Sequence, residues 1–190
     1  YPLRAMDQGF QESLVHGGGG LTQPGDYPGN RYLDPVLLHN GKHERTEGYC
    51  SDVYTRAAMK FIEEQKGAPF FVYLAFNAPH TPLEVPEEWV EPYLREGLDE
   101  TTAKIYAMVT NVDENLGRLD DHLRTLGLFE KTLVIFLTDN GPQQQRYTGG
   151  MRGQKGTVYE GGIRVPCFLR RPGQLQAGKV LATPAAHLDL

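Results

Sequence analysis

The sequence has few of the residues that mark disulfide-rich, zinc-binding or membrane proteins. Its 190 residues include two cysteines, Cys50 and Cys167, which form neither a disulfide framework nor a zinc-binding pattern. We expect both thiols to be buried, as free cysteines often are. No apolar run approaches the length of a membrane-spanning helix, and the first residues lack the charged start and apolar core of a signal peptide. The mean hydropathy of -0.45 and the 39% hydrophobic content predict a globular domain.

Basic residues are scarce in most of the chain and concentrated near its end. Residues 1–145 carry 12 Lys and Arg against 22 Asp and Glu, whereas residues 146–171 carry six basic residues and one acid, Glu160. The net charge of -5 argues against a nucleic-acid partner. The basic segment favours an anion near it, and an ordinary solvated face is the alternative.

Helical and strand patterns alternate along the chain. The helical repeat of apolar residues predicts helices at 51–66, 86–94 and 99–126, with Ser51 and Asp99 as N-caps of the first and the last. Uninterrupted apolar runs predict buried strands at 70–76, 133–138 and 165–170, and a short strand is expected at 36–39. Strands separated by helices require crossovers. We therefore expect an α/β fold with a mainly parallel (mixed) central sheet flanked by helices.

Two residues with oxygen ligands follow the strand at 133–138. Asp139 and Asn140 come directly after its apolar run, where ligands bind in open α/β sheets. Their side-chain oxygens suit Ca²⁺ or Mg²⁺ rather than zinc. An ordinary turn is the alternative, because Asp-Asn-Gly is common in turns.

Two further residues are candidates for chemistry. His80 follows the strand at 70–76 and lies between Pro79 and Thr81-Pro82, which stiffen its loop. Lys155 lies in a run with six glycines between residues 149 and 162, where its ammonium can bind an oxyanion. The run is not a P-loop, because Gln precedes Lys155 and Gly follows it.

Three stretches resemble motifs of the type I sulfatases, which are arylsulfatase-like members of the alkaline phosphatase superfamily. They are the strand end Thr138-Asp139-Asn140-Gly141-Pro142, the glycine-rich run from Arg152 to Pro166, and the strand and histidine loop from Phe71 to Leu83. The resemblance implies an alkaline-phosphatase-like fold and hydrolysis of a small-molecule or carbohydrate sulfate ester. It also implies one Ca²⁺, rather than Mg²⁺, and a formylglycine nucleophile made from Cys or Ser.

The resemblance assigns a role to each candidate residue. Asp139 and Asn140 match metal ligands of the family. Lys155 matches its sulfate-binding lysine, and His80 matches the histidine that contacts the ester and protonates the leaving oxygen. Lys155 and His80 are therefore both the catalytic and the substrate-binding candidates. A periplasmic, secreted or lysosomal location is implied as well, and the sequence makes no prediction of oligomeric state.

The sequence departs from the family pattern at the nucleophile. The motif Cys/Ser-x-Pro/Ala-x-Arg does not occur, and neither Cys50 nor Cys167 fits it. The acidic pair that completes the metal site is also absent. We therefore expect residues 1–190 to be an internal part of one sulfatase catalytic domain, without its N-terminal nucleophile region and its C-terminal subdomain, and to be inactive alone. A phosphoester or phosphonate hydrolase of the same superfamily and a non-catalytic anion- or calcium-binding relative remain the alternatives.

Overall fold

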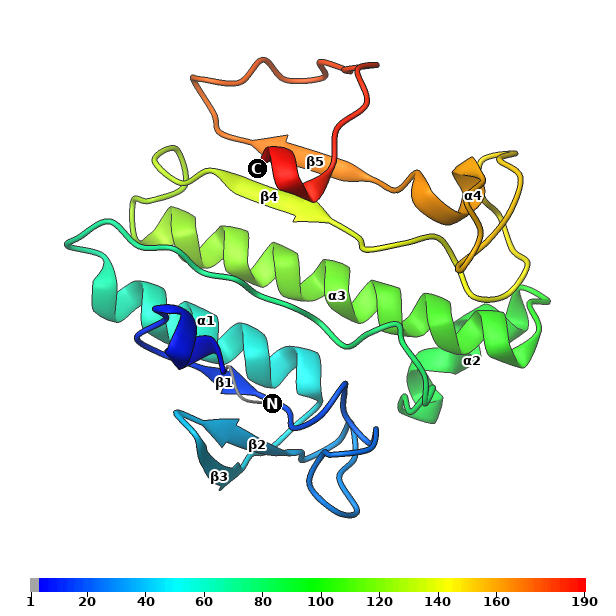
Figure 1. Cartoon of the computed structure of the whole chain (residues 1–190), viewed down its shortest axis with the longest axis horizontal. Helices are drawn as coiled ribbons and strands as arrows, with labels where there is room; N and C mark the ends of the chain where they lie inside the picture. The colour runs from blue at the N-terminus through cyan, green and yellow to red at the C-terminus, as the bar shows by residue number, and fades with distance from the viewer. Residues whose placement is uncertain (1–3) are drawn as a thin grey trace. The chain divides into compact units, whose positions relative to one another are not determined.

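The computed structural model describes residues 4–190, which form two compact units (Figure 1). The first unit ends at Leu126 and the second runs from Gly127 to Leu190. Helices and short strands occur in both, so the predicted α/β class is confirmed. Within residues 4–190 no helix is both long and apolar enough to cross a membrane.

Three helices build the core of the first unit. They are α1 (Cys50–Gln65), α2 (Glu87–Arg95) and α3 (Glu100–Thr125), and α3 packs against both of the others. The carboxylate of Asp99 accepts a hydrogen bond from the Thr102 amide (3.1 Å), which confirms the predicted cap. The predicted cap at Ser51 is wrong: Tyr49 is the N-cap of α1, and Ser51 is buried inside its first turn.

A polar network joins α1 to α3. One carboxylate oxygen of Asp52 accepts hydrogen bonds from Asn115 Nδ2 (2.7 Å), Asn111 Nδ2 (3.2 Å) and Arg118 Nη1 (3.2 Å). Both asparagines are buried and cannot reach water, so Asp52 provides a hydrogen-bond acceptor for their side-chain amides.

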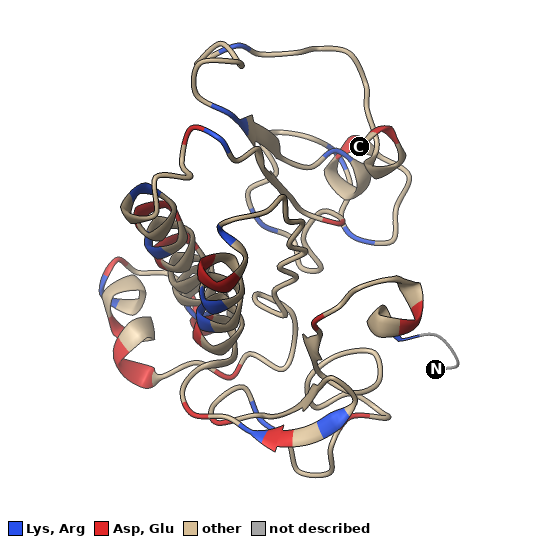
Figure 2. Cartoon of the chain, turned by 90° about the vertical axis from the view of Figure 1, so that its left-hand side faces the viewer, with Lys and Arg blue, Asp and Glu red and all other residues tan. Residues whose placement is uncertain are grey.

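A small antiparallel sheet precedes the helices. It follows a 3-10 turn, η1 (Ala5–Gln8), and contains β1 (Leu14–Val15), β2 (Val36–His39) and β3 (Lys42–Arg45). The predicted strand at 36–39 is confirmed. Asn40 and Gly41 connect β2 to β3, and both have positive φ angles (49° and 82°), as two-residue hairpins require. The residues of β3 are all exposed, and three of the four are charged (Figure 2).

The segment at 70–76, which we predicted to be a strand, is not paired as one in the structure. The backbone lacks helical structure there, and within residues 4–190 no strand pairs with it. The exposure of its side chains still alternates. Phe71 and Tyr73 are 71% and 74% exposed, whereas Val72 and Leu74 are partly buried. The segment thus has the two-faced pattern of a strand without a ladder partner among the described residues.

The second unit is built on one antiparallel pair. Strand β4 (Val134–Leu137) pairs with β5 (Cys167–Arg170), and Phe136 stacks on Phe168 with a centroid distance of 6.2 Å. The short helix α4 (Glu160–Ile163) and the 3-10 turn η2 (His187–Asp189) complete it. We expected mainly parallel pairing, but the ladders among residues 4–190 are antiparallel, because β4 has β5 and not residues 70–76 as its described partner.

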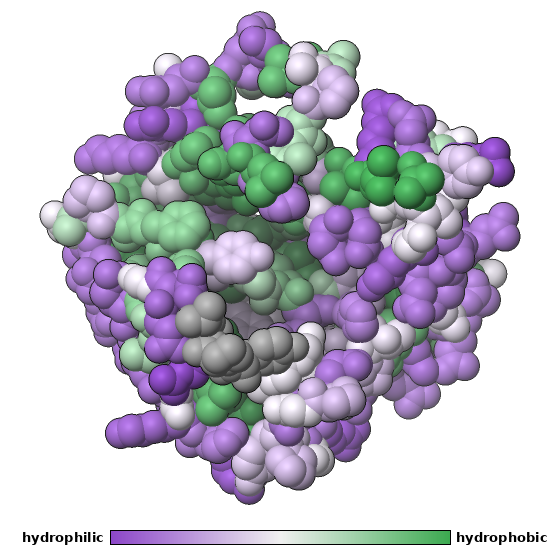
Figure 3. Space-filling view, in the orientation of Figure 1, coloured by the Kyte–Doolittle hydropathy of each residue, from purple (hydrophilic) through white to green (hydrophobic). Residues whose placement is uncertain are grey.

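The β4–β5 pair exposes apolar side chains. Figure 3 shows hydrophobic residues at the surface over these strands, where Leu137 and Phe168 are 41% and 64% exposed. Cys167 is exposed as well, so the expectation of a buried thiol is wrong for it and confirmed for Cys50. None of the described residues covers the Cys167 side chain.

Candidate functional site

The turn after β4 carries Asp139 and Asn140, as predicted. The Asn140 amide nitrogen Nδ2 donates a hydrogen bond to the Gly141 carbonyl oxygen (2.9 Å). This contact uses the donor side of the amide and leaves Oδ1 available to a cation. The Asp139 carboxylate belongs to an exposed residue. The turn therefore presents two hard oxygen donors at the end of the strand.

Glycines hold this turn against α4. The Gly141 amide donates to the Gly162 carbonyl oxygen (2.9 Å). A Cβ atom on residue 141 would lie 1.8 Å from the Gly161 carbonyl oxygen, so only glycine permits this approach. The Gly161 amide in turn donates to the Arg152 carbonyl oxygen (2.7 Å). Asn140 and the glycine-rich run are thereby fixed to the same short helix.

Lys155 lies on the same framework. Its backbone amide donates to the Pro142 carbonyl oxygen (2.9 Å), which closes the loop between the two segments. Its side chain is exposed, and among the residues that the structure describes no carboxylate forms an ion pair with it. An exposed ammonium without an ion-pair partner among the described residues is free to bind an oxyanion.

His80 lies in the first unit, in a loop fixed by three hydrogen bonds. Its amide donates to the Asn77 carbonyl (2.8 Å), and its own carbonyl accepts from the Tyr32 hydroxyl (3.0 Å). Its ring Nδ1 lies 2.8 Å from the Thr81 carbonyl oxygen. Because a carbonyl only accepts, Nδ1 carries a proton, and Nε2 is the nitrogen that can exchange a proton with a ligand.

The structure thus brings together three of the four predicted residues. Asp139, Asn140 and Lys155 share the second unit, and His80 belongs to the first. That His80 acts at the same site as the other three stays a prediction.

The side-chain oxygens of Asp139 and Asn140 are of the type that binds calcium, but two residues are too few to bind it. Ca²⁺ takes six to eight oxygen ligands. Across the described part of the chain, no group of three or more His, Cys, Asp or Glu side chains could hold a metal ion. Asp139 and Asn140 fit as two members of a larger ligand set.

Sequence reasoning counted Arg146 and Arg152 in the basic segment but did not single out either of them. The Arg152 guanidinium carbon lies 3.9 Å from the centre of the Tyr159 ring. Arg146 lies in the loop between Asn140 and Lys155, and its side chain is partly buried. The basic excess after residue 145 was the available signal, but charge alone does not identify which cations line a cavity.

These features define an α/β protein with two oxygen donors in the turn after β4 and an exposed lysine on the loop that is bonded to it. A model of the sulfatase family matches residues 3–190. The chain is 32% identical over 153 residues to the uncharacterized sulfatase YdeN of Escherichia coli (strain K12), which covers 77% of this chain and 27% of YdeN. It is 30% identical over 152 residues to N-acetylgalactosamine-6-sulfatase of Mus musculus, which covers 76% of this chain and 28% of that protein.

A solved sulfatase structure has a similar fold. Ps i-CgsB in complex with k-i-k-neocarrahexaose matches with a TM-score of 0.81 and 27% identity, over 92% of this chain and 42% of that chain. The chain belongs to the sulfatase family, and the sulfatase fold predicted from the sequence is confirmed. It spans less than a third of the length of the two curated relatives described above.

Proposed function

We propose that the complete protein containing this chain is a sulfuric ester hydrolase that removes sulfate from a carbohydrate. Membership of the sulfatase family supports the reaction. The observation that carries the proposal is the exposed Lys155 ammonium on a loop closed onto Pro142, two residues after Asn140. The name of N-acetylgalactosamine-6-sulfatase and the neocarrahexaose bound by Ps i-CgsB support a saccharide as substrate.

Charge stabilisation is the role of the second unit. Lys155 binds the sulfate oxygens, whose negative charge grows as the ester bond to the leaving oxygen breaks. Asp139 and Asn140 would hold Ca²⁺ together with ligands from outside these residues, and the ion would supply further positive charge at the site. Glycines 141, 161 and 162 allow the close backbone contacts that join this turn to the glycine-rich run that carries Lys155.

Proton transfer is the role of His80. In its protonated form Nδ1–H stays bonded to the Thr81 carbonyl, and Nε2–H can donate to the oxygen that leaves as the sulfur–oxygen bond breaks. A sugar alkoxide is a poor leaving group and needs this proton. We propose that a formylglycine outside these 190 residues would supply the nucleophilic oxygen. A periplasmic, secreted or lysosomal location stays a prediction from the family resemblance.

The test measures kcat/KM of the complete protein on 4-nitrophenyl sulfate, 4-nitrophenyl phosphate and N-acetylgalactosamine 6-sulfate. Lys155→Ala should lower kcat/KM on both sulfates by about 100-fold, the cost of one lost oxyanion donor. Lys131→Ala removes another exposed lysine, which lies before β4, and should change kcat/KM less than twofold. His80→Gln should cost more on the sugar than on 4-nitrophenyl sulfate, because 4-nitrophenolate leaves without a proton.

Two results would contradict the proposal. Preferential turnover of the phosphate ester would make the protein a phosphoester hydrolase of the same superfamily. Binding of Ca²⁺ and sulfate without turnover of any ester would make it a non-catalytic relative.

A further inference from the structure

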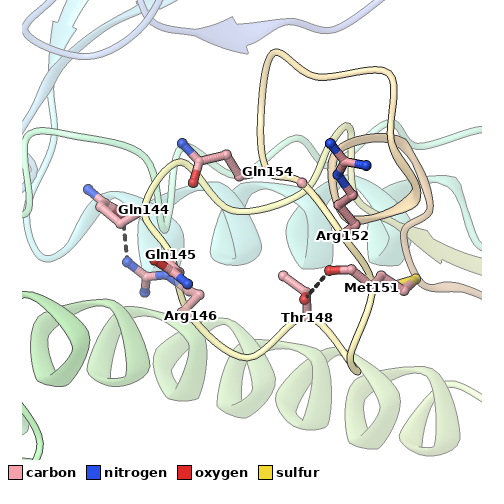
Figure 4. Close-up of a pocket in the computed structure, with 8 residues that line it drawn as sticks. Gln144, Gln145, Arg146, Thr148, Met151, Arg152 and Gln154 are labelled. Atoms are coloured by element: carbon pink, nitrogen blue, oxygen red, sulfur yellow. Dashed lines mark hydrogen bonds between the residues drawn. The ribbon is translucent and has the colours of Figure 1, made fainter.

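A polar cavity of about 340 Å³ lies in the loop that separates Asn140 from Lys155 (Figure 4). Its volume is in the range of small-ligand sites. Its lining includes Gln144, Gln145, Arg146, Thr148, Arg152 and Gln154. Two guanidinium groups and three side-chain amides thus line it, and its lining contains no acidic residue. Such a lining suits a charged oxygen ligand and not an apolar one.

Arg146 is the most unusual group in this cavity. Its Nη2 donates to Gln144 Oε1 (2.6 Å). Its Nε and Nη1 are buried, and neither finds an acceptor among the described residues. Buried polar groups are nearly always hydrogen-bonded, and a buried cation without an anion is costly. Donors left open inside a cavity therefore indicate an anionic ligand.

The rest of the loop is held in place around Arg146. The Thr148 hydroxyl donates to the Met151 carbonyl oxygen (2.7 Å), and Arg152 stacks on Tyr159. Figure 4 shows Gln144 and Arg146 on one side of the cavity and Arg152 on the opposite side. The loop positions two cations across one space without an acidic neighbour in the lining.

The cavity also adjoins the proposed sulfate-binding lysine. Gln154, which lines it, directly precedes Lys155, and the Lys155 amide closes the loop on Pro142. Lys155 itself does not line the cavity, but a ligand whose sulfate binds Lys155 could place a second group, on the same sugar or on its neighbour, in this adjoining space.

We propose that the cavity is a subsite for a second oxyanion of the substrate, a sulfate or a carboxylate on a carbohydrate, with Arg146 as its main ligand. The inference rests on the proposed function and specifies its substrate class: saccharides that carry at least two anionic groups. Arg146 is then a specificity-determining residue, and it takes no part in breaking the ester bond.

The test measures binding to the complete protein by titration calorimetry with three probes. They are N-acetylgalactosamine 6-sulfate, N-acetylgalactosamine 4,6-disulfate, and a disaccharide of glucuronic acid and N-acetylgalactosamine 6-sulfate. We expect at least one doubly anionic probe to bind about tenfold or more tightly than the monosulfate, as a charge-assisted contact implies. The tighter of the two shows whether sulfate or carboxylate is preferred.

Substitutions then locate the preference. Arg146→Ala should abolish it and leave monosulfate binding within twofold. Gln145→Glu adds a negative charge to the lining without removing a cation, and it should weaken the doubly anionic probes selectively even if Arg146→Ala fails to fold. Lys179→Ala removes an exposed cation outside the lining and should change nothing. Equal binding of all probes by the unaltered protein, or a preference that survives both substitutions, would overturn the subsite.

Hydrolysis is measured separately on 4-nitrophenyl sulfate. Turnover without any effect of Arg146→Ala on probe binding would retain the proposed function and reject the subsite. Binding that depends on Arg146, without turnover of any ester, would retain the subsite and reject the hydrolase.

Discussion

The geometry of the turn after β4 depends on the absence of one carbon atom at residue 141. The Gly141 amide bonds to Gly162, and the Gly161 carbonyl occupies the space where a side chain would begin. Neither contact involves a ligand, yet both determine where the Asn140 oxygen lies. Residue 141 is thus a positioning residue for the proposed site.

Gly141→Ala tests this dependence. The new methyl group must displace the Gly161 backbone, so we expect kcat/KM on 4-nitrophenyl sulfate to fall more than tenfold and stability to fall by about 1–3 kcal/mol, the usual cost of overpacking. Gly117→Ala is the matched control, because it lies in α3 with nothing within 4 Å of an added Cβ. It should stabilise the protein by about 0.5–1 kcal/mol through helix propensity. Equal effects of the two substitutions on activity would contradict this role of Gly141.

At the same residue scale, the sequence indicated some members of the site and missed others. Asp139 and Asn140 were recognisable because an apolar run stops abruptly in front of them. Lys155 was recognisable from its glycine neighbours. Arg146 was not, since the role proposed for it depends on burial of Nε and Nη1, which no local pattern encodes.

Among the elements, α1 and α3 are joined by one carboxylate. Asp52→Ala would leave the buried amides of Asn111 and Asn115 without their shared acceptor and remove the Arg118 ion pair. We expect a loss of about 2–3 kcal/mol in the free energy of unfolding of the complete protein, measured in urea. Asp113→Ala, an exposed acid on α3, should stay within about 0.5 kcal/mol of the unaltered protein. A loss no greater than that of the control would show that the network contributes nothing.

The small sheet has a pH-dependent contact of its own. His39 on β2 lies between Glu12 (Nε2 to Oε1, 2.5 Å) and Glu44 (Nδ1 to Oε2, 2.6 Å). Hydrogen bonds to Glu12 and then Glu44 raise the pKa of His39 above its usual 6.5. Hydrogen bonds from Asn40 and then His39 lower the pKa of Glu12 below 4.5.

The sign of the effect follows from these shifts. The His39 contribution is fully present below pH 6.5 and is lost as the pH rises through the raised pKa. The Glu12 contribution is present above pH 4.5 and is lost as the pH falls. His39→Gln should therefore cost more stability at pH 5.5 than at pH 8.5, by less than about 1 kcal/mol because the groups are partly exposed. Urea unfolding at both pH values measures the difference, and an equal cost at each would exclude the titration.

The three long helices α1, α2 and α3 were predictable to within one residue, whereas the short helix α4 was not predicted and the strands were predicted unevenly. Helical periodicity repeats over many residues in α3, so its limits of 100–125 are close to the expected 99–126. Strand β3 contains Lys42, Glu44 and Arg45 and has no apolar alternation to reveal it. Its only signal was Asn40-Gly41, the hairpin turn. The pairing of strands was the least predictable feature, because it joins segments that can lie far apart in the sequence.

At the scale of the whole molecule, both units expose large apolar side chains. Phe71 and Tyr73 are exposed in the first unit, and Leu137 and Phe168 are exposed in the second. Exposed faces of this kind bind partners or cause aggregation. The fold class followed from the order of elements in the sequence, but the exposure of these faces could be seen only in the structure.

We expect the 190-residue chain alone to self-associate and to bind a hydrophobic dye. Phe71→Lys with Tyr73→Lys should reduce both effects, since charges on an unpaired strand oppose pairing. Asp113→Lys with Glu114→Lys adds two lysines to an exposed polar part of α3 and should not. Sedimentation velocity and dye fluorescence measure the outcome. A monodisperse chain with a sharp, cooperative melt would contradict the expectation.

The extended segment at 70–76 has one more consequence. Proteases cleave chains that they can hold as a single extended strand. Phe71 and Tyr73 are the residues after which chymotrypsin cuts, and both face outward from a backbone without a ladder partner among the described residues. Brief digestion of the isolated chain should therefore nick it after Phe71 and Tyr73, as well as after other exposed aromatic residues such as Tyr147, which is 87% exposed. Protection of the same bonds in a longer form of the protein would show that a neighbouring strand pairs with residues 70–76 there.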